Sequence, residues 1–192
     1  MSVDNVAGAQ VCVRHLINQG HRRIGIITGS LALQRVQERL EGYQAALREA
    51  SIELAPELIL EILEGNFHQT TGYRLAKSLL LQHQRPTALF VPNGMVTIGA
   101  IQAMKETGLW SPTDIAIAAF DDLPLADVFQ PHLTAVAQPA YQIGYKGAEL
   151  LILAVGQEDR IPLSADRRKL APIFVGTPPL RTDHVFEARH SW

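Results

Sequence analysis

The chain has 192 residues, of which 47% are hydrophobic and 19% are charged, and its formal net charge at pH 7 is -2. This composition is typical of a soluble globular protein, and the length suits one domain or one large lobe. A domain that grips nucleic acid directly usually carries a strongly basic surface, which this charge balance does not favour. Cys12 is the single cysteine, so an intramolecular disulfide, a CxxC redox pair and a cysteine-based zinc site are excluded.

No targeting or membrane-spanning segment is recognisable in the sequence. The N-terminus lacks a basic flank followed by an apolar core, which an export signal requires. No apolar run reaches the roughly 18 residues that are needed to span a bilayer. We therefore expect a cytoplasmic protein that does not enter the membrane.

The first 122 residues alternate amphipathic helices with short apolar strands. Apolar residues recur at helical spacing between Asn5 and Gly20, and again from Val36 to Ala50, which predicts a helix in each segment. Further helices are predicted at 70–84 and 95–107, and strands at 24–28, 58–63, 88–91 and 115–120. Because these strands are continuous apolar runs, we expect an α/β protein with a three-layer, doubly wound parallel sheet.

The pattern changes after Asp122. A short strand is predicted at 133–137, a helix from Pro139 to Gly156, and a last strand at 171–175. The tail, residues 178–192, shows no periodicity and is predicted to be loose.

Polar side chains follow four of the predicted strands. Ligands of open parallel sheets bind outside the carboxyl ends of the strands, where loops and helix N-termini converge. An arginine, an aromatic ring, a carboxamide and a carboxylate are expected at this edge, namely Arg39, Phe67, Asn93 and Asp121. These groups suit a small hydroxylated molecule. We expect no metal and no cofactor, and His21, His68 and His83 lack metal-ligand spacing.

Each of these four residues also has a structural interpretation. Arg39 can pair with a neighbouring glutamate on a solvated helix face. Phe67 is of a residue type that lies in a core more often than in a site, and Asn93 can simply form a turn with the glycine after it. Asp121 is the hardest to explain in this way, because a buried carboxylate without partners is costly.

Several short segments stand out as a set, in a fixed order along the chain. They are Val3-Asp4-Asn5, residues 16–25 with His21-Arg22-Arg23-Ile24-Gly25, Arg39-Leu40-Glu41-Gly42-Tyr43, Gly65-Asn66-Phe67, residues 85–90, Phe120-Asp121-Asp122, and Gln138-Pro139 with Gly144. The set resembles the ligand-binding domain of the lactose/galactose (LacI/GalR) repressor family. These segments follow the order and spacing of the family from Val3 to about Gly156. The resemblance implies the type I periplasmic binding protein-like fold, in which two doubly wound lobes hold the ligand between them.

The resemblance also implies roles for the residues at the predicted edge. Arg39 matches an arginine that clamps the effector, and Phe67 matches an aromatic residue that stacks on it. Asn93 and Asp121 match polar groups that bind hydroxyls or ring nitrogens of the effector.

Three further positions are implied to lie in or near the pocket. Leu33 and Arg35 stand where family members differ, which implies that they tune specificity, and Gln138 lies near the crossing between the lobes. The chain departs from the family at Gly94, where aspartate is usual, and at Gly176, where the last strand usually ends with arginine.

The resemblance implies one complete lobe and part of a second. Residues 1–122 would form the C-terminal lobe, 123–160 a segment that completes the N-terminal lobe, and 161–177 a return strand. A DNA-binding helix-turn-helix has no counterpart in this sequence, so operator DNA would be reached only through a segment outside it. We expect apolar residues such as Val136, Ile143 and Leu150 to be covered by self-association as a homodimer.

The sequence thus predicts the effector-sensing domain of a LacI-type transcription regulator, with a sugar or related small molecule bound between the lobes. A periplasmic-type sugar-binding protein is one alternative, although it would need an export signal. A non-functional remnant or interaction module is another. An enzyme is not expected and no catalytic residue is assigned, because no GxGxxG, P-loop or GxSxG motif follows a predicted strand.

Overall fold

The computed structural model describes residues 2–63, 68–109, 111–121, 133–156, 169–170 and 173–175. The helices are α1 (Asn5–Asn18), α2 (Gln34–Glu49), α3 (Gln69–Leu80), α4 (Gly94–Glu106) and α5 (Ala140–Gly156), with a short 3-10 helix at Pro56–Leu58. The strands are β1 (Ser2–Val3), β2 (Ile24–Thr28), β3 (Ile59–Glu61), β4 (Ala88–Val91), β5 (Ala116–Phe120), β6 (Thr134–Ala137), β7 (Lys169–Leu170) and β8 (Ile173–Val175).

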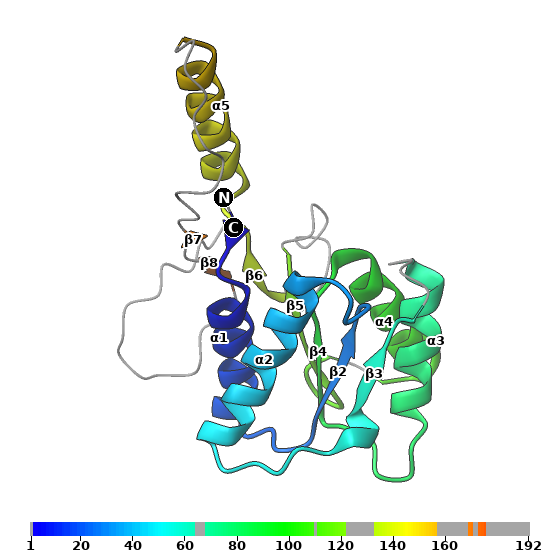
Figure 1. Ribbon diagram of the computed structural model, residues 1–192. Coiled ribbons are helices and arrows are strands. Elements are labelled where there is room, and N and C mark those ends of the chain that lie inside the picture. The colour runs from blue at the N-terminus through cyan, green and yellow to red at the C-terminus, as the bar shows by residue number, and fades with distance from the viewer. Residues whose placement is uncertain are drawn as a thin grey trace.

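A central sheet forms the middle layer of the fold. Its strand order is β3-β2-β4-β5-β6-β8, and the strands from β3 to β6 run parallel, whereas β8 pairs antiparallel with β6. Helices α1 and α2 cover one face of the sheet, and α3 and α4 cover the other (Figure 1). This is the three-layer doubly wound α/β fold that the sequence predicts, since parallel neighbours require helical crossovers.

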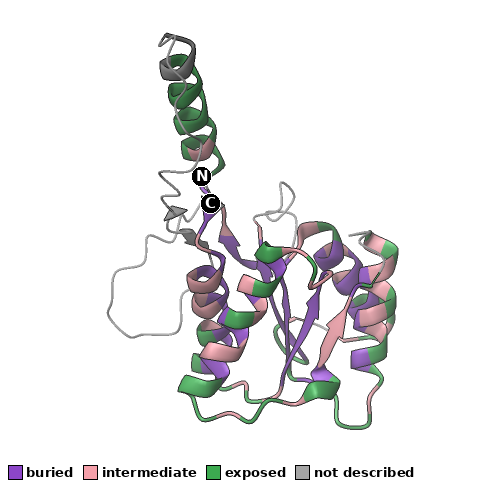
Figure 2. Ribbon diagram, in the orientation of Figure 1, coloured by how far each residue is buried: buried purple, intermediate pink, exposed green. Residues whose placement is uncertain are grey.

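Each face of the sheet has its own hydrophobic core. Because side chains alternate along a strand, Ile26 of β2 packs with α1 and α2, whereas the adjacent Ile27 packs with α3 and α4. The same alternation separates Phe90 from Leu89 in β4. Strands β2, β4 and β5 are buried along their whole length (Figure 2). The carboxyl ends of these strands therefore lie between the layer of α1 and α2 and the layer of α3 and α4.

The structure differs from expectation at Thr134–Ala137, the strand within the predicted segment 123–160. Strand β6 pairs with β5 in the main sheet, with Ala118 opposite Thr134, so this strand belongs to the same lobe as β2 to β5. Val136, which was expected to need cover, is fully buried in the core on the α1 side. A short apolar run does not reveal which sheet it joins. Here the strand joins the main sheet because it pairs with the edge of β5. The predicted last strand is present as β8, and the tail at 178–192 lies outside the described residues.

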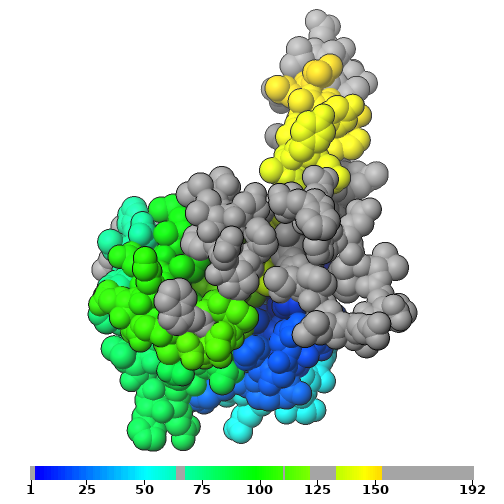
Figure 3. All heavy atoms as spheres, turned by 180° about the vertical axis from the view of Figure 1, so that it is seen from behind, coloured from blue at the N-terminus to red at the C-terminus, as the bar shows by residue number. Residues whose placement is uncertain are grey.

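Helix α5 extends away from the sheet and its covering helices (Figures 1 and 3). Its first turn contacts the core through Ile143. Within the part of the helix whose side chains are described, residues 140–152, five large apolar side chains are 54% to 83% exposed; they are Tyr141, Tyr145, Leu150, Leu151 and Ile152. An apolar surface of this kind usually marks a contact with another element or another chain.

Candidate functional site

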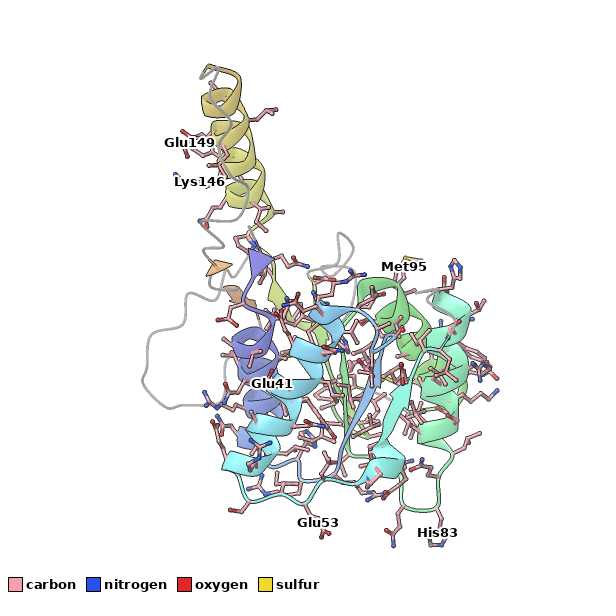
Figure 4. The ribbon with its side chains drawn as sticks, in the orientation of Figure 1. Glu41, Glu53, His83, Met95, Lys146 and Glu149 are labelled. Atoms are coloured by element: carbon pink, nitrogen blue, oxygen red, sulfur yellow. The ribbon has the colours of Figure 1, made fainter. Side chains whose placement is uncertain are left out.

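Four of the predicted site residues lie at the carboxyl end of the sheet. Arg39 is on α2, Asn93 is the residue that caps α4, Asp121 directly follows β5, and Gln138 follows β6. Met95, in the first turn of α4, marks this end of the molecule in Figure 4. Parallel strands end on the same side of the sheet, so the loops and helix N-termini that follow them converge at this edge.

Arg39 is buried even though it lies on a helix rich in charged residues. Its Nε donates to Oδ1 of Asn5 at 2.9 Å, and its Nη1 donates to the carbonyl oxygen of Pro92 at 2.6 Å. The guanidinium carbon lies 3.8 Å from the centroid of the Phe120 ring, in a cation–π contact. Glu41, by contrast, is exposed on α2 (Figure 4). The interpretation of Arg39 as a solvated surface side chain is therefore wrong.

Asp121 brings a carboxylate to the same place from the end of β5. Its Oδ2 lies 3.9 Å from Nη1 of Arg39, and its Oδ1 accepts a hydrogen bond from Nε2 of Gln138. The backbone of Asp121 has a φ of 85°, in the left-handed region that aspartate tolerates better than most residues. Its N–H donates to the carbonyl oxygen of Val136 at 2.9 Å, which holds this turn. Arg39, Asp121 and Gln138 thus form one connected polar cluster.

Arg39 and Asp121 differ in how much solvent reaches them. Burial lowers the pKa of the Arg39 guanidinium from its ordinary value, and the carboxylate of Asp121 opposes that shift. An arginine remains protonated at neutral pH in either case, so a positive charge faces the side chain of Asp121. The Arg39 side chain is 9% exposed and that of Asp121 is 30% exposed. The carboxylate of Asp121 is therefore the part of the pair that is more open to solvent.

Asn93 combines a structural contact with a remaining donor. Its Oδ1 accepts from the backbone N–H of Val96 at 3.1 Å, which caps α4. Among the described residues its Nδ2 has no hydrogen-bond partner. Asn93 directly follows Pro92, whose carbonyl accepts from Arg39. The carboxamide thus places a donor one residue from the group that holds the guanidinium.

The remaining predicted residues lie further out or outside the description. Leu33 is partly exposed at the N-terminal cap of α2, and Arg35 is exposed in the first turn of that helix. Burial has the largest effect on the pKa of Arg39 and lowers it, whereas Asp121 raises it. The positive charge of Arg35 lowers this pKa further. Phe67 lies outside the described residues. The structure thus joins three of the seven predicted residues in direct contact.

Sequence reasoning missed the groups that hold the guanidinium of Arg39. Asn5 was considered only as the start of a predicted helix and as part of a resemblance motif, yet its side chain is buried and bonded to Arg39. Phe120 was considered only as part of a strand and of a resemblance motif, although the alternation along the strand places its ring with Ala118, on the opposite face from Ala119. The carbonyl of Pro92 has no signal in the sequence, because every residue has one.

The polar side chains at this edge can bind a ligand through hydrogen bonds. Within the parts of the chain that the structure describes, no group of three or more His, Cys, Asp or Glu side chains is arranged to hold a metal ion. No helix in those same ranges is long and apolar enough to cross a bilayer. A guanidinium, a carboxylate and two carboxamides lie at this edge, with an aromatic ring against the guanidinium. Such groups bind a polar molecule that both donates and accepts hydrogen bonds.

A doubly wound sheet with charged and amide side chains at its carboxyl edge is typical of the α/β lobes that bind ligands. Residues 13–172 match the family of periplasmic binding protein-like domains. The chain belongs to this family.

Relatives of this chain include transcriptional regulators. It is 39% identical over 149 residues to the ribose operon repressor of Haemophilus influenzae, an alignment that covers 78% of this chain and 44% of the repressor. A regulatory protein of the LacI family from Chloroflexus aggregans matches with a TM-score of 0.80 and 33% identity, over 90% of this chain and 60% of that one. A complex of the transcriptional regulator CelR with cellobiose matches with a TM-score of 0.79 and 29% identity, over 90% of this chain and 51% of that one. The chain spans about half the length of the curated relatives that it matches.

Proposed function

We propose that this chain is the effector-sensing domain of a LacI-type transcription regulator, and that its effector is a sugar or a related small polyhydroxylated molecule. Its similarity to a ribose operon repressor and to a regulator bound to cellobiose supports this proposal. The intact regulator works in the cytoplasm and contacts operator DNA through a separate DNA-binding segment. Effector binding then changes the affinity for DNA by a coupling energy of about 1–3 kcal/mol, as is typical of allosteric proteins. The role is binding rather than catalysis.

The observation that carries the proposal is the charge pair of Arg39 and Asp121 at the sheet edge. The more exposed carboxylate accepts hydrogen bonds from ligand hydroxyls. Nη2 of Arg39, which has no hydrogen-bond partner among the described residues, donates to a ligand oxygen, and Nδ2 of Asn93 offers a second donor. Each hydroxyl of a sugar both donates and accepts, so an acceptor beside two donors matches neighbouring hydroxyls.

The other site residues have supporting parts in this proposal. Gln138 donates to Asp121 and so holds the carboxylate in place. Leu33 and Arg35, at the start of α2, tune which effector is accepted. Phe67 stacks on the apolar face of the sugar ring.

Replacement of Asp121 by asparagine tests the proposed site. Asparagine also tolerates a left-handed backbone, so the turn after β5 should survive while the charge is lost. Because a hydrogen bond to a charged group is worth about 1.5–3 kcal/mol, we expect roughly ten- to hundredfold weaker binding. The measurement is an NMR titration of the chain with a sugar panel that includes D-ribose and cellobiose, extended to millimolar concentrations.

Asp114→Asn is the matched control, because Asp114 is an exposed carboxylate near the opposite end of β5. It should bind the best sugar of the panel like the unaltered chain. Equal affinities for Asp121→Asn and the unaltered chain would remove Asp121 from the site. A chain that binds no member of the panel would contradict the sugar as effector.

We further propose that the chain forms a homodimer to which the exposed apolar side chains of α5 contribute. At high concentration the chain should sediment as a dimer, because burial of these side chains favours association. Leu151→Glu should shift it toward the monomer. Leu81→Glu, at a site of nearly equal exposure beyond α3, should not; Leu151 is 65% exposed and Leu81 66%. A strictly monomeric unaltered chain at all concentrations refutes the dimer.

A further inference from the structure

The side chain of Asn5 joins two side chains of opposite charge. Asn5 is the first residue of α1 and is 6% exposed. Its Oδ1 accepts from Nε of Arg39 at 2.9 Å, and its Nδ2 donates to Oε2 of Glu38 at 2.8 Å. Nδ2 also reaches the carbonyl oxygen of Val3 at 3.3 Å. Every polar atom of this carboxamide is therefore used inside the protein.

The partners of Asn5 allow only one orientation of the amide. The Nε of Arg39 is a donor, so it requires the amide oxygen, and the carboxylate of Glu38 is an acceptor, so it requires the amide nitrogen. A flipped amide would set donor against donor and acceptor against acceptor. Glu38 is itself held from its other oxygen, Oε1, which accepts from Nε2 of Gln34 at 3.1 Å. The orientation of Asn5 is thus determined by chemistry on both sides.

This contact orients the guanidinium of Arg39. Hydrogen bonds to a guanidinium lie close to its plane, so the acceptors on Asn5 and Pro92 together define that plane. The ring of Phe120 lies against the guanidinium at 3.8 Å and holds it from one side. Nη2 is the guanidinium nitrogen that has no hydrogen-bond partner among the described residues. Its direction is set by the contacts that Asn5, Pro92 and Phe120 make with the rest of the group.

We propose that Asn5 is a positioning residue of the effector site, which holds Arg39 so that Nη2 is presented to the ligand. The inference rests on the proposed function of Arg39 in effector binding. It also predicts a requirement that packing alone does not impose. The group at position 5 must accept from Arg39, and its contact with residue 38 must pair a donor with an acceptor.

Four variants of the chain separate positioning from general stability. Asn5→Ala removes the acceptor for Arg39. Asn5→Asp keeps the acceptor but sets a carboxylate against Glu38, whereas Asn5→Asp combined with Glu38→Gln restores the donor–acceptor pair in the reverse direction. Asn18→Ala is the control, because Asn18 is exposed at the last turn of the same helix. Aspartate at the first turn of a helix is favourable, so the double variant should fold.

Two measurements are made on each variant. One is the affinity for D-ribose and for cellobiose by NMR titration. The other is the hydrogen-exchange rate of the Arg39 Nε–H, which is assigned by its loss in Arg39→Lys and needs no ligand. We expect Asn5→Ala to weaken binding and to accelerate exchange by about tenfold each, since a hydrogen bond to a charged group is lost. The double variant should stay within about threefold of the unaltered chain, and Asn5→Asp alone should lie between them.

Two results would overturn the proposal. One is an Asn5→Ala variant whose exchange rate and affinity equal those of Asn18→Ala. The other is a double variant as impaired as Asn5→Asp, which also decides the question if Asn5→Ala does not fold. If the unaltered chain binds neither sugar, the sugar proposal fails, while the exchange rate of Arg39 still decides the positioning by Asn5.

Discussion

Replacing Arg39 with methionine is expected to lower the affinity of the chain for its effector by at least about a hundredfold. Methionine can keep the apolar contact with Phe120, but it supplies no donor and no positive charge. The carboxylate of Asp121 then loses its countercharge at the site, and the ligand loses the hydrogen bond from Nη2. The measurement is the same NMR titration with D-ribose and cellobiose, together with urea unfolding to show that the variant is folded.

Two further variants sharpen this test. Arg39→Lys keeps the charge but lacks the planar fork that bonds Asn5 and Pro92 together, so we expect it to bind nearly as weakly as the methionine variant. Arg48→Met, in the last turn of the same helix and exposed, should bind like the unaltered chain. If Arg39→Met kept the affinity of the Arg48→Met control, the guanidinium would have no part in binding.

Replacing Gly99 with alanine should reduce the free energy of unfolding by about 3 kcal/mol, because overpacking a tight helix contact forces the backbone to move. A Cβ at position 99 would lie 2.0 Å from the carbonyl oxygen of Gln69 and 2.5 Å from the backbone nitrogen of Tyr73. These are backbone atoms of α3, which cannot move aside as a flexible side chain would. The backbones of helices α3 and α4 must therefore move apart at this contact. Urea unfolding followed by circular dichroism measures the loss.

Gly147→Ala provides the matched control for Gly99→Ala. Gly147 is also a helical glycine, but a Cβ there meets nothing within 4 Å. Alanine should therefore favour local helix formation by up to about 1 kcal/mol, without lowering the unfolding midpoint. If both alanine variants unfolded at the same urea concentration, the close approach of α3 and α4 would not limit the packing.

The strands of the central sheet could be predicted closely from the sequence. The runs at 24–28 and 88–91 coincide with β2 and β4, and the run at 115–120 contains β5. These strands are covered on both faces, so nearly every residue in them must be apolar, and polar residues mark where they end. The edge of the sheet at which Arg39, Asn93 and Asp121 lie follows from the same pattern, because strands that run parallel end on the same side.

What the sequence alone determined is thus the alternation of helices and strands and the edge of the sheet at which polar residues collect. Tertiary structure decided which of those residues bond to one another. Arg39 meets Asn5 and Pro92, which are 34 and 53 residues away along the chain. Local periodicity carries no information about such partners. The same holds for β6, which joins the main sheet, and for α5, which leaves it. Strand and helix patterns report how much of a segment is buried, but the surface that buries it is supplied by distant parts of the chain.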